Sequence, residues 1–508
     1  MFTRRSTACL SLIVALAGCG GARVATSPAP AGPPPVTRAA LTRMIDSMVN
    51  APEFRTALWG ILIVDPEARD TLYAHNAAKL FIPASNQKLV SGSVILEQLG
   101  PEFRFRTTFA AHGTVANGTL TGDLAVIGRG DPTMSDRMQK DAMTPLRTIA
   151  DSLWERGIRR ITGSVVAIGN AFPGPVAGAG WGWDALDGAS FAGVDELLLN
   201  EGLSTFRVRP GANIGDTAVV ETRPSRTFPS VRVVATTIAR DTSTAPAAGR
   251  GSRGGSGTRV SAYHDTLTSA VIVRGQIALG DSATITLPQH DPNTAFVAAL
   301  TEVLTDRGIT VERQATTWSQ ESQADSLFTV LSVPLKEIMP VLLKPSQNQV
   351  AEAFLRALGL ERAGVGTADS GRRVIERQFA AWNIPADAFV VRDGSGLSRS
   401  DLISPEAIVS ILEVMRRSPN FTVFYEALPI AGVDGTIRTR MRDTPAQGNL
   451  RAKTGTLSMV RSLSGYVRTA DGRLLEFSML CNNWTTPQAA VDRVQDTIGS
   501  MLAQLRLR

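Results

Sequence analysis

The polar segment Pro83-Ala84-Ser85-Asn86-Gln87-Lys88 stands directly before a run of apolar residues at helical spacing, which extends to Leu99. The spacing predicts a helix that begins at this segment, with the proline at its start. On a helix, Ser85 and Lys88 lie three positions apart and share one face. A serine hydroxyl becomes a nucleophile when a base lies within hydrogen-bond reach, and the lysine supplies that base. The backbone N–H groups at the helix start favour developing negative charge, as an oxyanion hole requires.

Two further strings follow in the chain, Ser346-Gln347-Asn348 and Lys453-Thr454-Gly455. Each string alone has a structural interpretation: a capped helix start for the serine–lysine pair and for Ser346, and a strand end before a turn for Lys453. Together and in this order, they predict the nucleophile, the proton shuttle and the carboxylate-facing strand of a penicillin-recognising serine acyltransferase.

The chemistry expected of these residues is acyl transfer. Ser85 Oγ attacks a peptide carbonyl, and Lys88, crowded by other cations and partly desolvated so that its pKa falls, accepts the proton as general base. Ser346 relays that proton to the leaving amine, and Asn348 orients Lys88 and the substrate backbone through hydrogen bonds. Lys344 is expected to add positive potential nearby.

The third string is predicted to lie on a strand over residues 450–458. Alternation along a strand places Lys453 and Gly455 on one face and Thr454 and Thr456 on the other. The glycine permits close backbone approach, so the strand edge can pair with the substrate while the lysine and a threonine hydroxyl hold a terminal carboxylate. The backbone N–H groups of Thr456 and of the nucleophilic serine are expected to form the oxyanion hole.

Composition restricts the other classes of function. The chain has 508 residues, of which 43% are hydrophobic and 19% charged, and this predicts two or three well-packed domains. The formal charge is +6 and no run of five basic residues occurs, so nucleic-acid binding has little support. No cofactor and no metal site are predicted, because the histidines are dispersed and no His-x-x-x-His or Cys-x-x-Cys spacing occurs. The four histidines are His75, His112, His264 and His290.

The N-terminus predicts export. Residues 1–18 combine a basic start with a short apolar run and are interpreted as a signal peptide, too short to span a membrane. Leu16-Ala17-Gly18-Cys19 resembles a bacterial lipobox, so Cys19 is predicted to carry a lipid that anchors the protein at the periplasmic face, in the outer membrane if one is present. The alternative is an ordinary cleavage site beside a chance cysteine. Residues 19–37 are predicted to form a proline-rich tether, and Cys481 to be a small core residue, so no disulfide is expected.

The two ends of the chain are predicted to build one domain of the α/β (α+β) class, an antiparallel sheet covered by helices. The elements that support it are an N-terminal helix around Leu41–Met48, a strand at Leu58–Val64, a hairpin at Leu463–Cys481 and a helix at Pro487–Leu505. The predicted catalytic domain comprises residues 38–102 and 288–508, with a helix at Asp291–Gly308 and mostly helices from Leu335 to Phe424.

The interval between Ser85 and Ser346 is far longer than one helical subdomain needs, so inserted domains are predicted. Short alternating strands with frequent Gly and Thr fill much of it. The first β-rich insert is assigned to residues 103–205 and 260–287, and a second, nested insert to residues 206–259. Within the second, residues 242–258 are predicted to form a mobile loop because they contain few apolar residues.

Three more strings carry a family resemblance: Gly128-Arg129-Gly130-Asp131-Pro132-Thr133, Asp393-Gly394-Ser395-Gly396-Leu397-Ser398 and Gly432-Val433-Asp434-Gly435-Thr436. With the first three motifs, the chain from Arg38 onward resembles the D-alanyl-D-alanine carboxypeptidase/endopeptidase family of class C low-molecular-mass penicillin-binding proteins. The resemblance implies a transpeptidase-like domain with a helical subdomain and two nested inserts. It further implies peptidoglycan stem peptides as substrate, β-lactams as acylating inhibitors, and an acyl-enzyme that water resolves.

Two positions depart from the family pattern. The middle residue of the second motif is often Asp in the family and is Gln347 here, and little change is expected because Ser and Asn carry the chemistry. Residues 168–172 lack an acidic residue that many relatives place in this part of the insert, which leaves the specificity for the third stem residue open.

Two alternative functions remain. A β-lactamase shares the nucleophile, the lysine and the strand motif, but it needs a further base for deacylation and has no large inserts. Glu352 is not counted as such a base because it is predicted to lie within a helix. A lipid-anchored wall-binding scaffold with a vestigial site is the other alternative, although none of the three motifs is damaged.

Overall fold

The computed structural model describes residues 37–182, 185–241, 257–265, 268, 270–318 and 324–507. The predicted signal peptide, Cys19 and nearly all of the predicted tether lie outside these residues, as does the predicted loop 242–258 except for its last two residues. Among the residues that are described, no helix has both the length and the apolar character needed to cross a membrane.

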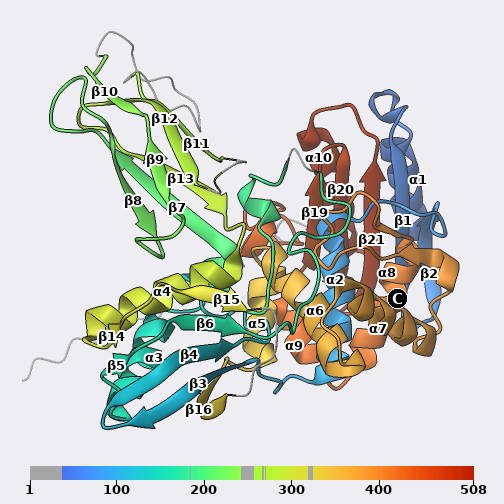
Figure 1. The fold of residues 1–508 in the computed structure, drawn as a ribbon. Helices are drawn as coiled ribbons and strands as arrows, with labels where there is room; N and C mark the ends of the chain where they lie inside the picture. Colours follow the sequence, from blue (N-terminus) through green and yellow to red (C-terminus); the bar gives the residue numbers. More distant parts are fainter. Residues whose placement is uncertain are drawn as a thin grey trace, which may run out of the picture. The chain divides into compact units, whose positions relative to one another are not determined.

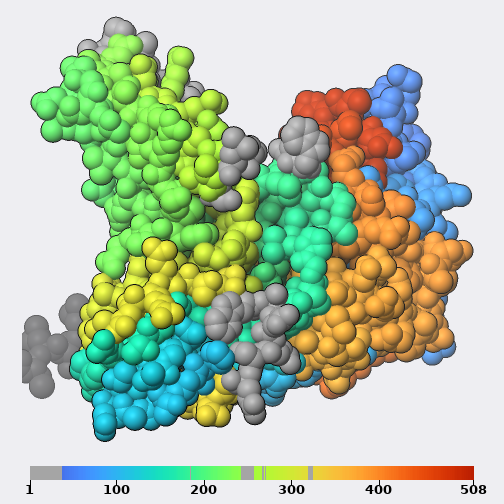
Figure 2. Space-filling model, viewed as in Figure 1, coloured from blue at the N-terminus to red at the C-terminus, as the bar shows by residue number. Residues whose placement is uncertain are grey.

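Segments from both ends of the chain share one sheet. Its strands are β1 (Leu58–Asp65), β2 (Asp70–His75), β19 (Arg451–Leu457), β20 (Val460–Arg468) and β21 (Leu474–Asn482). Their spatial order is β19-β20-β21-β1-β2, and every neighbouring pair is antiparallel. The predicted C-terminal hairpin is therefore confirmed. In the space-filling view, blue N-terminal and red C-terminal segments lie side by side (Figure 2).

Helices cover both faces of this sheet (Figure 1). On one face, α1 (Arg38–Val49) and α10 (Gln488–Gln504) pack with apolar residues of the strands. On the other face lie α2 (Gln87–Leu99), α5 (Leu335–Leu343), α6 (Asn348–Ala363), α7 (Ala368–Ala381), α8 (Pro405–Arg417) and α9 (Phe421–Ala427). This arrangement confirms the predicted fold class. Because helices cover both faces, nearly all residues of β20 and β21 are buried.

Short elements lie between the longer ones along the chain. They are the strand pair β17 (Phe389–Val390) and β18 (Leu402–Ile403) and the 3-10 turns η1 (Pro52–Phe54), η2 (Ala84–Asn86), η4 (Ala189–Phe191), η5 (Asn200–Gly202), η6 (Ala386–Ala388) and η7 (Gly435–Ile437).

The first insert is a mixed sheet with two helices packed on it. Its strands are β3 (Arg106–Ala116), β4 (Thr119–Ile127), β5 (Arg160–Ile161), β6 (Val165–Ile168), β14 (Thr310–Val311), β15 (Thr316–Trp318) and β16 (Asp325–Leu331). The helices α3 (Thr144–Glu155) and α4 (Pro292–Arg307) share one apolar core with these strands. The Asp291 carboxylate caps α4, Pro292 is its first residue, and Gly308 ends it with φ 94°, so the helix predicted here is confirmed.

The second insert consists of two smaller sheets around a separate core. One sheet contains β7 (Leu203–Arg209), β8 (Val219–Arg223) and β13 (Ala283–Pro288), and the other contains β9 (Val231–Val233), β10 (Thr236–Ile238), β11 (Arg259–His264) and β12 (Val271–Ala278). Apolar side chains of both sheets meet between them, among them Phe206, Val208, Val271, Val273 and Ile277.

These pairings revise the predicted domain boundaries. Residues 260–287 were assigned to the first insert, but β11, β12 and β13 complete the sheets of the second. Residues from 288 onward were assigned to the catalytic domain, but α4 packs in the core of the first insert and β16 pairs with β3 of that insert. The reason is physical: strand pairing joins segments that are far apart in the chain, and local alternation does not reveal the partner.

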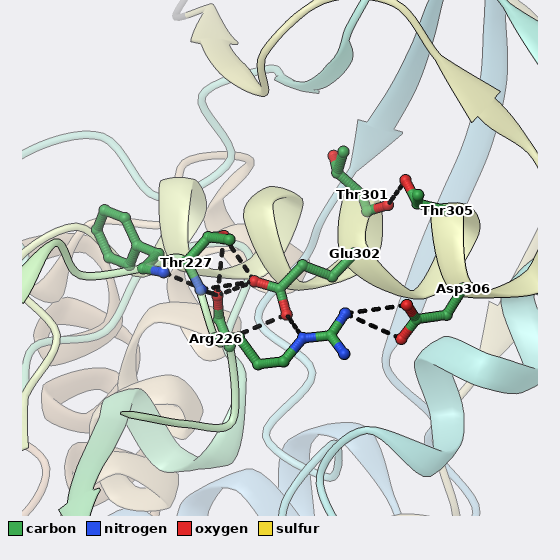
Figure 3. Close-up of polar contacts among 8 residues, drawn as sticks. Arg226, Thr227, Thr301, Glu302, Thr305 and Asp306 are labelled. Carbon is green, nitrogen blue, oxygen red and sulfur yellow. Dashed lines mark hydrogen bonds and ion pairs between the residues drawn. The ribbon is translucent and has the colours of Figure 1, made fainter. Parts of the chain in front are cut away.

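A buried carboxylate connects the two inserts (Figure 3). Glu302 of α4 accepts hydrogen bonds from Ser225 Oγ at 2.7 Å, the Thr227 backbone N–H at 2.8 Å and the Arg226 backbone N–H at 3.0 Å. The Arg226 guanidinium also donates to both carboxylate oxygens of Asp306, each at 3.0 Å. The turn after β8 is thus fixed to α4 by charge-assisted hydrogen bonds.

Candidate active site

Ser85 lies in η2, the single 3-10 turn that leads into α2. The predicted helix start is confirmed, with the serine in the turn and the lysine in the first turn of the helix. The turn is fastened to β20 by two hydrogen bonds of buried side chains. Asn86 Nδ2 donates to Ser464 Oγ at 2.7 Å, and Ser462 Oγ donates to the Pro83 carbonyl at 2.7 Å.

Lys88 is fully buried, and its Nζ has three hydrogen-bond partners. It lies 3.0 Å from Ser85 Oγ, 2.6 Å from Asn348 Oδ1 and 2.7 Å from the backbone carbonyl oxygen of Ser395. As an ammonium it donates to all three. As a neutral amine it keeps two N–H donors for the carbonyl and amide oxygens, which only accept, and turns its lone pair towards the serine hydroxyl. The site therefore accommodates both protonation states of the amine.

Burial lowers the pKa of Lys88 to about 7. The predicted lowering of the pKa and its predicted cause, desolvation, agree with this value. The largest effects of charged neighbours on Lys88 come from the carboxylates Asp393, Glu352 and Asp401, which raise its pKa. The lowered pKa comes from desolvation, and the carboxylates limit how far it falls.

The loop that presents the Ser395 carbonyl is held by two buried carboxylates. Asp393 accepts from the backbone N–H groups of Gly396 at 2.6 Å and Ser398 at 2.7 Å, and Glu352 accepts from that of Ser395 at 2.9 Å. Glu352 lies within α6, as predicted, yet its carboxylate supports this loop. The roles of Ser395, Asp393 and Glu352 were not predicted. The signal that could have indicated them is the Asp-Gly-Ser-Gly string, because small residues after an Asx position suit a tight loop.

The second motif forms the start of α6. Ser346 has φ 64°, and the Gln347 side chain caps the helix by accepting from the Asn348 backbone N–H at 2.8 Å. Asn348 Nδ2 donates to the Ser190 carbonyl at 2.9 Å, which directs its Oδ1 towards Lys88. The motif therefore caps a helix, as its structural interpretation predicted, and it also places Asn348 beside Lys88.

Lys453 of β19 completes the group from a third part of the chain. Its buried Nζ donates to Ser346 Oγ at 2.7 Å and to the Thr454 carbonyl at 2.8 Å. Burial, followed by the positive charges of Lys88 and Arg461, holds the pKa of Lys453 well below its ordinary range. The five residues predicted to be catalytic thus form two hydrogen-bonded sets, Lys88 with Ser85 and Asn348, and Lys453 with Ser346.

Gly455 allows the strand to approach the nucleophile. A Cβ atom at this position would lie 2.5 Å from the Pro83 carbonyl oxygen and 2.9 Å from the Ser85 backbone nitrogen, so a side chain would displace the turn. The hydroxyl of Thr454 donates to Thr436 Oγ1 at 2.7 Å, and the Arg461 guanidinium donates to Thr456 Oγ1. The glycine therefore lets the strand lie close to the turn of the nucleophile, and its role in pairing with the substrate stays a prediction.

Lys344, which precedes the second motif, and Gln347 within it have partners that were not predicted. Lys344 forms an ion pair with Asp434, so its charge is largely offset and the expected positive potential is not supported. Gln347 Nε2 donates to Glu201 of η5, whose carboxylate also accepts from Arg137 Nε at 3.0 Å. The first insert therefore contacts the motif directly.

Within the described part of the chain, one group of side chains has the composition and spacing to hold a metal ion: Asp187, His264 and His290. None of the three belongs to the hydrogen-bonded group around Lys88.

Comparison with known proteins agrees with this geometry. The model of the D-Ala-D-Ala carboxypeptidase 3 (S13) family matches residues 41–505. The D-alanyl-D-alanine carboxypeptidase of Actinomadura sp. strain R39 is 29% identical over 91% of this chain and 84% of its own. The D-alanyl-D-alanine carboxypeptidase DacB of Haemophilus influenzae is 26% identical over 81% of this chain and 82% of its own.

A solved structure shows the same fold. Penicillin-binding protein 4 from Haemophilus influenzae superposes with a TM-score of 0.76 at 22% identity, covering 90% of this chain and 99% of the other. The predicted fold class, family and activity class are confirmed by these matches. The chain belongs to the D-Ala-D-Ala carboxypeptidase 3 (S13) family.

Proposed function

We propose that this hydrolase acts as a serine D-Ala-D-Ala carboxypeptidase/endopeptidase on peptidoglycan stem peptides or their cross-links, through an acyl-enzyme on Ser85. The observation that carries the proposal is the buried Lys88 Nζ, 3.0 Å from Ser85 Oγ and bonded to two oxygens that only accept. With a pKa of about 7, a large fraction of Lys88 is a neutral amine near neutral pH. The pair therefore supplies a nucleophile and its base.

In the acylation step, Ser85 Oγ bonds to the carbonyl carbon while its proton moves to Lys88 Nζ. The backbone N–H groups of Ser85 and Thr456 stabilise the oxyanion, and collapse of the tetrahedral intermediate breaks the C–N bond. Ser346 relays the proton that Lys88 accepted to the leaving amine, and Lys453 Nζ, which donates to Ser346 Oγ at 2.7 Å, orients that hydroxyl. Water then cleaves the ester and releases the shortened peptide.

Lys453 and the threonine hydroxyls of β19 are proposed to hold the terminal carboxylate of the substrate. A carboxylate placed there favours the ammonium form of Lys453. The positive charges of Lys88 and Lys453 disfavour each other, so a charged Lys453 favours the neutral form of Lys88. Substrate binding would thereby prepare the general base.

Inhibition by β-lactams is part of the same proposal, since a lactam carbonyl presents an amide bond to the same serine. Support comes from the penicillin-binding protein 4 of Haemophilus influenzae, whose structure is also known in complex with a β-lactam and superposes with a TM-score of 0.70.

The location is proposed from the sequence. The basic, apolar N-terminus ending in Leu16-Ala17-Gly18-Cys19 supports export and a lipid on Cys19 at the periplasmic face of a bacterial membrane. Growth with labelled palmitate tests it: label on the wild-type protein and none on Cys19→Ser is expected, and equal labelling of both would contradict the anchor.

Labelling with a fluorescent penicillin tests the nucleophile. The wild type is expected to retain one label through denaturing electrophoresis, and Ser85→Ala none. Ser93→Ala is the matched control, because that hydroxyl lies on the same helix and is bonded within it to the Val90 carbonyl. Undiminished labelling of Ser85→Ala would refute the proposal. Rapid turnover of the penicillin would favour a β-lactamase, and wall binding without any labelling would favour a scaffold.

Digestion of purified sacculi tests the substrate. Release of D-alanine from pentapeptide stems is expected from a carboxypeptidase, and conversion of cross-linked dimers to monomers from an endopeptidase. Muropeptides left unchanged by a protein that labels fully with penicillin would exclude peptidoglycan as the substrate while retaining the acylating serine.

A further inference from the structure

Two of the four histidines, which are dispersed in the sequence, meet in the fold. His264 ends β11 and is buried, and His290 lies between β13 and α4. Their rings stack with centroids 3.6 Å apart and an angle of 24° between the planes. Asp187 Oδ1 lies 2.8 Å from His264 Nδ1 and 3.6 Å from His290 Nε2. Two imidazoles and one carboxylate thus present three ligand atoms that all lie within 4.8 Å of one another.

This set of donors suits a zinc ion. Imidazole nitrogen and carboxylate oxygen bind Zn²⁺ at about 2.0–2.2 Å, which places two ligand atoms of a tetrahedral site about 3.3 Å apart. The two distances from the carboxylate, 2.8 Å and 3.6 Å, lie on either side of that separation. Calcium and magnesium are disfavoured because they bind through oxygen ligands. The side chains of Asp187 and His290 are each 48% exposed, so water can reach the fourth position.

The three residues come from different parts of the fold. His264 and His290 belong to the second insert and the turn that leaves it, and Asp187 precedes η4. Three residues after the aspartate, the Ser190 carbonyl accepts from Asn348 Nδ2, the side chain that faces Lys88. A metal ion held by all three would therefore tie the segment beside the catalytic residues to the second insert.

We propose that Asp187, His264 and His290 form a zinc site that fastens residues 185–192 to the second insert. The proposal concerns a site separate from the acylating serine and stands independently of the substrate assigned above. It replaces the expectation from the sequence that no metal would bind, which relied on the absence of short-range ligand spacing.

Binding is measured on the full mature chain, made without a histidine tag and freed of metal by chelation. Titration with Zn²⁺ against a chelating dye is expected to show one equivalent bound, and Co²⁺ to give the visible absorption of a tetrahedral nitrogen–oxygen site. His290→Ala and Asp187→Asn are expected to weaken zinc binding at least about 10-fold. Both side chains are half exposed, so the fold should tolerate the changes.

His112→Ala is the matched control, because His112 also lies beside a carboxylate, that of Asp123 at 3.6 Å, and is not part of the proposed site. This variant is expected to bind one zinc like the wild type. Absence of stoichiometric zinc on the wild type, or equal affinity in His290→Ala and Asp187→Asn, would overturn the site.

Hydrogen exchange tests the fastening. With zinc added to the wild type, the backbone amides of residues 185–192 are expected to exchange several-fold more slowly, and those of the strands β20 and β21 to remain unchanged. His290→Ala should show no such slowing at the same zinc concentration. Zinc binding without slower exchange in this segment would overturn the fastening.

Discussion

The surroundings of Lys88 and of Lys453 differ in the sign of their charges, although both lysines are fully buried. Three carboxylates face Lys88 and raise its pKa against the effect of burial, which leaves it at about 7. At Lys453, the positive charges of Lys88 and Arg461 instead add to the effect of burial and lower its pKa further. Lys88 can therefore exist in both protonation states near neutral pH, whereas the ammonium form of Lys453 would be favoured by a negatively charged ligand.

This difference suggests a division of labour. A base that must accept and return a proton works best with a pKa near the operating pH, which is the situation of Lys88. A residue that must bind a carboxylate gains most if its charge is uncompensated before the ligand arrives, which is the situation of Lys453. Substitutions that act on one lysine region and leave the other intact can separate these roles.

Removing the amine of Lys88 is expected to have the largest effect. Lys88→Met takes away the general base, and the acylation rate with penicillin should fall about 10³-fold. Stopped-flow measurement of acylation with a fluorescent penicillin gives this rate. Lys336→Met is the control, because Lys336 is a surface residue that pairs with Glu102. A decrease of less than tenfold would assign the base to another group.

Removing the amine of Lys453 should act on carboxylate recognition. Lys453→Met is expected to lower kcat/KM for a peptide that ends in a free carboxylate about 100-fold, the value of one or two charge-assisted hydrogen bonds. Hydrolysis of the same peptide with a terminal amide should fall much less. If both peptides lose activity equally, Lys453 acts in proton transfer and the contrast between the two lysines fails.

A methyl group between the two regions should disturb both. Gly455→Ala would place a Cβ 2.9 Å from the Ser85 nitrogen and 2.5 Å from a carbonyl oxygen, so the turn must shift. We expect acylation to slow about 10- to 100-fold, because displacements of about 1 Å have effects of this size. Gly499→Ala on α10 is the control, where the nearest atoms belong to flexible side chains. Unchanged acylation would show that the turn adapts freely.

The pH dependence of acylation reports the carboxylates around Lys88. Protonated Lys88 cannot accept a proton, so the rate should be low at acid pH, rise through about pH 7 and level off above it. Asp393→Asn removes the carboxylate that raises the pKa of Lys88 most, so its midpoint should move to lower pH. At pH 6 the variant would then be up to about tenfold faster relative to its own plateau. A midpoint that moves upward would contradict the proposed balance.

The contact of the first insert with the second motif should have the smallest effect. Gln347→Asp introduces the residue usual in the family, but it places a carboxylate near Glu201, whose pKa burial already raises. We expect a loss of stability of about 1 kcal/mol and a few-fold slower acylation. Thermal unfolding and penicillin labelling measure both. A more stable variant would show that the amide donor of Gln347 contributes nothing.

Much of the catalytic region was predictable because its signals are local. The apolar spacing after Lys88 gave the start of α2, the alternation around Ala470–Arg473 gave the β20–β21 hairpin, and the three motifs come together as expected. Each of these features depends on neighbours within a few residues or on a short string whose chemistry is recognisable.

What could not be predicted depends on long-range pairing. The partner of β16 lies more than 200 residues earlier in β3, and no local pattern specifies it. The same limit applies to the charges around Lys88, since Glu352 and Asp393 reach it from a helix and a loop far away in the chain. The meeting of His264 with His290 is a third example.

The pairing of β1 with β21 determines when the central sheet can be completed during translation. The first strand of the central sheet emerges early, but its neighbour is among the last segments to be translated. The two inserts have cores of their own and are complete long before that moment, so they can fold while synthesis continues. The nascent chain therefore carries an unpaired sheet edge for most of its synthesis. A chain that stops before β21 lacks the strand that joins β1 to β20, so we expect it to be inactive.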